Sequence, residues 1–277
     1  MVAMKARVPS SAGSSCVKDL REGPRARPKH AMPEPKQIKT TRRTYTREKV
    51  ASLAPWLRGP VPPTLVFSDT HLVPCVKAWT DDAPEDLLAL FQALSGHELL
   101  SLGDLTESVG LRRAQRAQLF RCERLRPLWG LMRARGARML IGNHDVSGEG
   151  LIRGYFGDEA VFSRETFPRE AFPGELRVRH GHEAERGMTE LVRRVGPLAV
   201  PIYEHAFRLS GRGPERIANA KVLNTLAGEQ GFHLFGHTHG RALEVSDPEP
   251  WANPGCFLRS AQSFLTIEGM EIALYVG

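Results

Sequence analysis

Three polar side chains follow one another directly after an apolar run near the middle of the chain. Residues 139–141 are Met, Leu and Ile, and Gly142 is followed by Asn143, His144 and Asp145. The apolar run predicts the end of a buried strand, and the glycine allows a sharp turn behind it. An amide, an imidazole and a carboxylate on one strand-end loop favour a metal-binding or catalytic cluster over the alternative, a polar turn with a chance histidine.

The same arrangement recurs after four other β-prone runs. The polar residues at these strand ends are Asp69 and His71, Asp104, His180 and His182, and His237 and His239. Carboxylates, imidazoles and an amide without thiolates suit Mn, Fe or Zn. The set holds more ligands than one ion needs, which favours two divalent ions about 3.5–4 Å apart that share a carboxylate.

The spacing of the histidines gives some of these pairs more weight than others. His237 and His239 stand two residues apart, and alternate residues of an extended segment point the same way. His180 and His182 have the same spacing, and one of them can be a supporting residue instead of a ligand. His205 and His233 carry no such signal.

The elements that must position these residues alternate between strand and helix. We expect strands at residues 64–67, 98–102 and 139–141, and helices at residues 84–94 and 111–135, the second bent or broken near Pro127. This order implies parallel strands with right-handed crossovers, and such sheets collect functional groups at their carboxyl ends. Strands at 175–179 and 232–235, a hairpin at 263–276, and a helical, lid-like insertion at 183–230 complete the prediction.

Charge separates the first 60 residues from the rest. Residues 1–60 hold 14 Lys and Arg against 4 Asp and Glu, whereas residues 61–277 hold 24 against 27. We therefore predict a basic, mostly disordered leader over 1–60, with one helical turn near residues 48–57, and a folded domain over 61–277. The leader could contact nucleic acid or an anionic membrane weakly; a solubilising tail is the alternative.

Composition predicts a globular protein of the cytoplasm. Hydrophobic residues make up 41% of the 277 residues, and no apolar run approaches the roughly 20 residues of a transmembrane segment. The N-terminus lacks the apolar core of a secretory signal. The four cysteines are scattered and suit reduced thiols. The oligomeric state stays open.

Five motifs in order, S-D-T-H-L, G-D-L-T-E, G-N-H-D, H-G-H and G-H-T-H, resemble the calcineurin-like metallophosphoesterase superfamily. The resemblance covers about residues 64–276. It implies an α/β fold, a β-sandwich of two mixed sheets flanked by helices, with the insertion over the active site. By this resemblance the first metal ion is held by Asp69, His71, Asp104 and His239. The second is held by Asp104, Asn143, His180 and His237.

The resemblance also assigns roles around the metals. His144 corresponds to a histidine that stabilises the transition state or protonates the leaving oxygen, and Asp145 would orient it. His180 is preferred to His182 as the ligand because it ends its strand directly. Glu107 fills the last position of the G-D-x-x-D/E pattern, and Asn253 begins an Asn-Pro-Gly turn found in many small members.

The implied activity is hydrolysis of a phosphoester or diphosphate bond in a small molecule by a metal-bridging hydroxide. A metal-dependent nuclease acting on DNA or RNA is one alternative, favoured by the basic leader but not by the acidic body. A non-catalytic binding scaffold is the other. The insertion weakly resembles the cap of UDP-2,3-diacylglucosamine hydrolases. Arg208, Arg212 or Arg216 could meet a substrate phosphate there, although a solvated helix face is the simpler interpretation.

Overall fold

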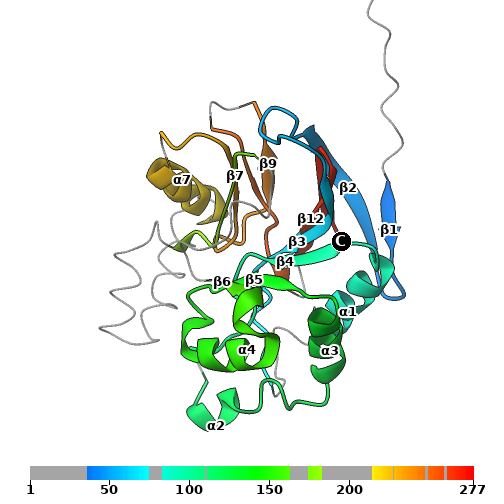
Figure 1. Cartoon of the computed structure of the whole chain (residues 1–277), viewed down its shortest axis with the longest axis vertical. Helices are drawn as coiled ribbons and strands as arrows, with labels where there is room; N and C mark the ends of the chain where they lie inside the picture. Colours follow the sequence, from blue (N-terminus) through cyan, green and yellow to red (C-terminus); the bar gives the residue numbers. More distant parts are fainter. Residues whose placement is uncertain are drawn as a thin grey trace, which may run out of the picture. The chain divides into compact units, whose positions relative to one another are not determined.

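The computed structural model describes the chain over residues 36–74, 83–109, 111–162, 174–182, 214–226, 228–246, 249–258 and 261–277. All of them belong to one unit that runs from Pro35 to Gly277. Two β-sheets and several helices make up this unit (Figure 1). The predicted fold class, α/β with two mixed sheets flanked by helices, is confirmed.

The larger sheet has nine strands and mixes parallel with antiparallel pairs. Its strands are β1 (Gln37–Lys39), β2 (Thr44–Ser52), β3 (Val61–Phe67), β4 (Glu98–Ser101), β5 (Arg138–Leu140), β6 (Val161–Phe162), β11 (Phe257–Leu258), β12 (Ala261–Gly269) and β13 (Glu271–Val276). The order is β1-β2-β13-β12-β3-β4-β5-β6, and β11 pairs with β12. Strands β3, β4 and β5 are parallel neighbours, as the strand–helix alternation predicts, and β6 continues the parallel order.

The smaller sheet has four strands in the order β7-β8-β10-β9. They are β7 (Leu176–Arg179), β8 (Phe232–Phe235), β9 (Ala242–Glu244) and β10 (Trp251–Asn253). Strands β7, β8 and β10 run parallel, and β9 pairs antiparallel with β10. The two parallel strands β7 and β8 therefore end at the same edge of this sheet.

The helices are α1 (Ala83–Ala93), α2 (Arg113–Arg116), α3 (Arg126–Ala134), α4 (Glu149–Phe156) and α7 (Pro214–Leu226). Two single turns of 3₁₀ helix, η1 (Val146–Gly148) and η2 (Asp158–Ala160), flank α4. The predicted helix at 84–94 is confirmed. The helical region expected at 111–135 is broken near Pro127, as predicted, and forms α2 and α3. Pro127 stands in the first turn of α3, where its missing N–H costs nothing.

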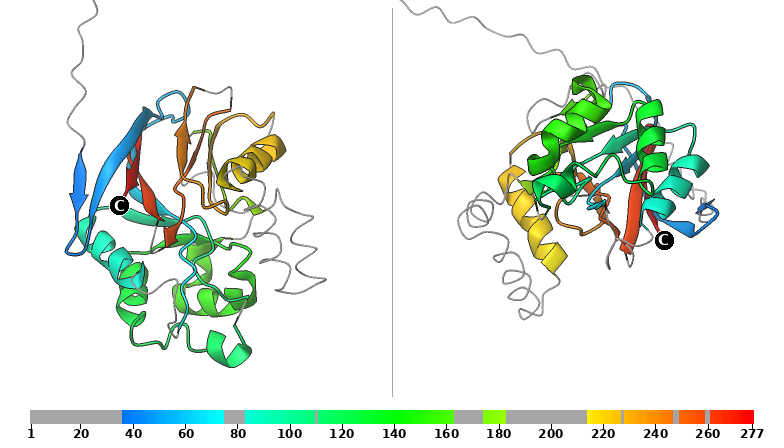
Figure 2. Two further views of the ribbon diagram at one scale, coloured as in Figure 1. Left: turned by 180° about the vertical axis from the view of Figure 1, so that it is seen from behind. Right: turned by 90° about the horizontal axis from the view of Figure 1, so that it is seen from below.

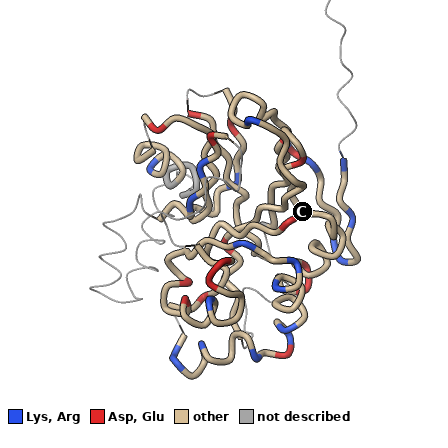
Figure 3. Tube along the Cα trace, viewed as in Figure 1, with Lys and Arg blue, Asp and Glu red and all other residues tan. Residues whose placement is uncertain are grey.

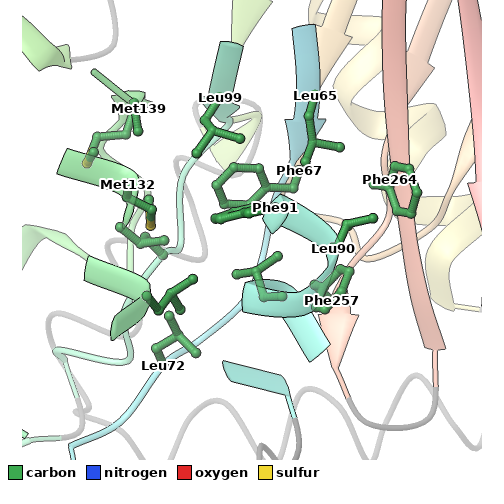
Figure 4. Close-up of a cluster of buried hydrophobic side chains, with 14 of the residues drawn as sticks. Leu65, Phe67, Leu72, Leu90, Phe91, Leu99, Met132, Met139, Phe257 and Phe264 are labelled. Atoms are coloured by element: carbon green, nitrogen blue, oxygen red, sulfur yellow. The ribbon is translucent and has the colours of Figure 1, made fainter. Parts of the chain in front are cut away.

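Alternation along the strands builds four layers. In β3, Leu65 and Phe67 pack with Phe91 of α1 and Met132 of α3, whereas Val66 belongs to the core between the two sheets. The helix-facing core is drawn in Figure 4. On the other side, Val222 and Leu226 of α7, with Phe235 and Trp251, form a third cluster. Helices thus cover the outer face of each sheet (Figures 1 and 2).

The N-terminal boundary predicted at residue 60 is wrong for the part that the structure describes. Strand β1 pairs with β2, and β2 pairs with β13 along almost its whole length. The expected helical turn at 48–57 overlaps β2. Arg42 and Arg43 ion-pair with buried Asp86 of α1 at 2.6 and 2.7 Å. Residues 36–60, which the prediction assigned to the basic leader, therefore belong to the folded unit. Residues 1–35 lie outside the described residues.

Residues 183–213, most of the predicted lid-like insertion, also lie outside the described part, and with them Arg208 and Arg212. Helix α7 occupies most of the insertion's remainder. Among the described residues, no helix combines the length and apolar character needed to cross a membrane.

Candidate metal centre

The parallel strands β3, β4 and β5 bring three predicted motifs to one edge of the larger sheet. Backbone hydrogen bonds join their loops directly: Asp69 N–H donates to Gly103 O at 3.1 Å, and His71 N–H donates to Asp104 O at 3.0 Å. His144 N–H donates to Asp104 Oδ1 at 2.8 Å. The three loops are therefore held as one unit.

The smaller sheet brings its two motifs to the same place. His180 follows β7, and Gly236 N–H after β8 donates to His180 O at 2.9 Å. The next amide, that of His237, donates to Asp69 Oδ2 at 2.9 Å. This bond joins the strand-end loops of the two sheets, so motifs separated by 168 residues meet in one site.

The backbone at this site is held in an unfavourable conformation. Five non-glycine residues of the described chain have positive φ, and all five are predicted ligands: Asp69 (52°), His71 (45°), Asp104 (51°), His237 (68°) and His239 (57°). Left-handed geometry costs a non-glycine residue roughly 1–2 kcal/mol. Such conformations cluster at functional sites and persist only where the surrounding structure imposes them.

Two glycines of the motifs are required by close approach. A Cβ on Gly142 would lie 2.1 Å from Asp104 Oδ1, and a Cβ on Gly236 would lie 2.0 Å from Ser68 Oγ and 2.9 Å from Asp69 Oδ2. A side chain at either position would displace a predicted ligand or the serine next to one. The glycines of G-N-H-D and G-H-T-H therefore make room for carboxylates that arrive from β3 and β4.

One group of converging ligand atoms contains Asp69, His71 and His239, all within 4.8 Å of one another. The two Nε2 atoms of His71 and His239 are 3.2 Å apart, and His239 Nε2 is 3.5 Å from Asp69 Oδ1. His71 Nδ1 lies 3.0 Å from Glu107 Oε2, which makes Nδ1 the protonated nitrogen and leaves a lone pair on Nε2.

The second group contains Asp104, His180 and His237. His180 Nδ1–H donates to Leu102 O at 2.8 Å, so Nε2 is the nitrogen that faces the site. It lies 3.1 Å from Asp104 Oδ2 and 3.1 Å from Asn143 Oδ1. Asp104 also appears in a third group with His71 and His144. Its position between the groups fits the predicted bridging role.

The donor atoms fit divalent cations. A neutral His180 ring would direct the lone pair of Nε2 toward Asp104 Oδ2 and Asn143 Oδ1, which also carry lone pairs. A cation between these three atoms satisfies all of them at once. Asp69 Oδ1 is fully buried and accepts no hydrogen bond from the described residues. A buried carboxylate oxygen without a hydrogen bond is costly unless an ion neutralises it.

His144 is partly exposed, with 27% of its side chain accessible. Its Nδ1 lies 2.7 Å from Glu107 Oε1, and its ring meets that of His71 edge-to-face with centroids 4.7 Å apart. One Glu107 carboxylate thus bridges a predicted ligand and the predicted catalytic histidine.

The predicted role of Asp145 in orienting the His144 ring is wrong. The Asp145 carboxylate accepts hydrogen bonds from the amides of Leu105, Thr106 and Gly142 and from the Thr106 hydroxyl, at 2.7–3.1 Å. It is completely buried and joins the loops after β4 and β5. Glu107 takes the orienting role instead.

Electrostatics in the centre favour charged carboxylates. Burial opposes ionisation of Glu107, but hydrogen bonds from His144 and His71 lower its pKa to about 2. Burial likewise opposes protonation of His144, but Glu107 and Asp104 raise its pKa to about 9. Asp104 is buried too, yet the neighbouring His180 holds the pKa of this carboxyl well below its usual range.

His182 is buried beside the centre without joining any of the three ligand groups. Its ring centroid lies 5.2 Å from that of His180 and 6.2 Å from that of His237. The structure therefore brings His180, not His182, to the ligand atoms. His233, which carried no signal, is buried within β8 with Nε2 3.1 Å from Glu229 O.

Sequence reasoning left two residues out of the site. Glu107 was placed only as part of the G-D-x-x-D/E pattern, although its spacing from Asp104 was the available signal. Asn219 of α7 hydrogen-bonds Thr238 and Gly240 around the G-H-T-H loop. No motif marks Asn219, and only the packing of α7 on the smaller sheet brings it there.

Comparison with known proteins adds information on the fold alone. The chain matches no protein-family model and no curated protein. Solved structures similar to it include a novel archaeal phosphodiesterase (15% identity, 76% of this chain and 99% of that chain, TM-score 0.37) and a metallophosphoesterase from Sphaerobacter thermophilus (16%, 78% and 88%, 0.39). A predicted phosphoesterase from Streptococcus pneumoniae is another (12%, 75% and 83%, 0.30).

The names of these three neighbours are phosphodiesterase, metallophosphoesterase and predicted phosphoesterase. At such identities the similarity concerns the fold, and the chemistry of the centre depends on its own residues. The weaker resemblance to UDP-2,3-diacylglucosamine hydrolases concerns the cap, most of which lies outside the described residues.

Proposed function

We propose that this chain is a metal-dependent hydrolase of phosphoester bonds in a small molecule, with two divalent ions in the centre. The observation that carries the proposal is that three ligand groups from the loops of two sheets overlap, with Asp104 shared by two of them and His71 by two. The first ion would be held by Asp69, His71 and His239, with Asp104 shared. Asn143, His180 and His237 would hold the second.

Divalent ions supply Lewis acidity at a phosphoryl oxygen and lower the pKa of water. The chain itself supplies orientation and a proton. Glu107 accepts the Nδ1–H of His144 and so points Nε2–H toward the substrate side. The Glu107 carboxylate favours the protonated form of the His144 ring, in which Nε2–H can donate to the leaving oxygen.

The charge distribution supports a small substrate over a nucleic acid. Figure 3 draws Lys and Arg interspersed with Asp and Glu along the described chain. A nuclease takes much of its affinity from basic contacts with the phosphate backbone, which such mixed charge does not favour. The small-molecule proposal therefore comes first, and nucleic acids are test substrates that can overturn it.

The test combines metal analysis with a substrate panel on one preparation of the full chain. We expect about two Mn ions per chain, and hydrolysis of p-nitrophenyl phosphate or bis-(p-nitrophenyl) phosphate that EDTA abolishes. Single-stranded and duplex DNA and RNA at physiological salt should be poor substrates. A chain that binds no metal, or binds it and cleaves none of these esters, would overturn the proposal.

Replacing Asp104 by Asn isolates the shared carboxylate. The amide keeps the shape and an oxygen for the His144 amide but removes the negative charge between the two groups. We expect metal content to fall and turnover to be lost. Asp158→Asn is the matched control, since the Asp158 side chain is 86% exposed on η2. Equal metal content in the two variants would exclude a bridging role for Asp104.

A further inference from the structure

Asn219 stands where the packing of α7 calls for an apolar residue. Val222 and Leu226 of α7 pack with Phe235 and Trp251 of the smaller sheet. Asn219 lies three and seven residues before them, on the same face of the helix, and is 7% exposed. Burial of an amide is unfavourable unless its groups are hydrogen-bonded, so the contacts of Asn219 must account for its place.

Those contacts all lead to one loop. Asn219 Nδ2–H donates to Gly240 O at 3.0 Å, and Asn219 Oδ1 accepts from the Thr238 hydroxyl. Asn253 Nδ2 donates to Asn219 Oδ1 at 3.2 Å and lies 2.7 Å from Thr238 Oγ1 and 3.3 Å from Gly236 O. The bonds reach residues 236, 238 and 240 and so alternate with the two histidines between them.

The braced loop holds one ligand of each ion. His239 belongs to the group with Asp69, and His237 to the group with Asp104. Both histidines have positive φ, 68° at His237 and 57° at His239, a conformation that the loop keeps only if its surroundings impose it. The buried bonds from Asn219 and Asn253 are those surroundings on the side of the loop that faces α7.

We propose that Asn219 is a positioning residue that sets the affinity of the centre for both metal ions by holding His237 and His239 in place. The inference deepens the proposed function and rests on it. It makes α7 part of the metal site without any contact between this helix and the metals. It also accounts for a buried amide within an otherwise apolar helix face.

The test replaces Asn219 by Leu, which extends the apolar stripe and removes both hydrogen-bonding groups. Supporting residues of this kind contribute about 10- to 100-fold to metal affinity. We expect the dissociation constant for Mn to rise by that factor while the thermal midpoint of the chelated protein stays unchanged or increases. Saturating Mn should restore kcat with an unchanged KM. Asn224→Leu, on the exposed face of the same helix, should bind Mn like the wild type.

The outcomes separate the two proposals. If the wild type binds no Mn, the proposed function fails. If the wild type binds Mn and Asn219→Leu binds it within about twofold, only the positioning role fails. Should Asn219→Leu not fold, Asn219→Asp serves, because it keeps the acceptor for Thr238 and loses the donor to Gly240. Wild-type affinity in a folded Asn219→Asp would equally refute the role.

Discussion

Replacing Glu107 by glutamine removes the one carboxylate that accepts hydrogen bonds from both His71 and His144. A neutral amide oxygen can still accept one of these N–H groups, but its NH₂ group can only donate to the other ring. Glutamine at this position therefore breaks at least one bond to an ionised acceptor, at 2.7 or 3.0 Å. A hydrogen bond to a charged group contributes about 1.5–3 kcal/mol, which corresponds to roughly 10- to 150-fold in rate or affinity.

The loss of Glu107 should appear in two measurements, because its carboxylate contacts both a candidate metal ligand, His71, and the candidate proton donor, His144. Disordering His71 lowers Mn affinity, which equilibrium dialysis detects. Disordering His144 lowers kcat at saturating Mn. Glu107 also raises the pKa of His144, so its removal should move the alkaline limb of the pH–rate profile to lower pH. The direction follows because His144 acts in its protonated form and loses its proton earlier without the carboxylate.

Glu123→Gln provides the control, since Glu123 is an exposed glutamate outside the centre. It should match the wild type in Mn affinity, kcat and pH profile. The reasoning would be refuted by a Glu107→Gln variant whose kcat and Mn affinity both lie within about twofold of the control. A normal rate with an unshifted alkaline limb would specifically exclude the proton-donating role of His144.

Two further predictions concern the frame around the centre. Gly142→Ala should reduce metal content and thermal stability, because its Cβ would meet Asp104 Oδ1 at 2.1 Å. Gly150→Ala is the control, because a Cβ on this residue of α4 has no atom within 4 Å, and it should stabilise the protein by about 0.5–1 kcal/mol. Burial opposes ionisation of Asp86, but hydrogen bonds from Arg42 and Gln262 lower its pKa in the folded protein. The ionised carboxylate therefore adds to the free energy of unfolding above a pH near 4, and this contribution is lost as the pH falls through the folded pKa. Urea titrations at pH 6 and pH 3 should therefore find Asp86→Asn less stable than the wild type by about 1.5–3 kcal/mol at pH 6, with the difference reduced at pH 3.

The fold was predictable where one physical rule dominated the local sequence. Parallel strands β3, β4 and β5 follow from short apolar runs separated by helical segments, and α1 follows from its apolar spacing and from Pro84 in its first turn. Strand β2 was missed because alternation on a basic strand resembles a solvated leader. Its partner β13 comes from the opposite end of the chain, and only this long-range pairing makes a strand of it.

The centre was predictable for a different reason. Its candidate ligands stand directly at strand ends, and sheet topology brings such positions together whatever the intervening chain does. Residues whose role depends on which group a long or flexible side chain contacts were not predictable in this way. Asp145 follows His144 directly, yet it bonds backbone amides, whereas Glu107 reaches both rings from a loop on the neighbouring strand. Adjacency in sequence was a poor guide to which carboxylate meets which ring.

The strained backbone explains why the centre lies between two sheets and not on one loop. Five left-handed residues at about 1–2 kcal/mol each together cost on the order of 5–10 kcal/mol. This is comparable with the net stability of a whole domain, about 5–15 kcal/mol, so no single loop could maintain it. Bonds that cross between loops, from His71 to Asp104 and from His237 to Asp69, distribute the cost over both sheet cores. Substitutions that break these cross-loop contacts should therefore lower both the stability of the sheets and the affinity for metal.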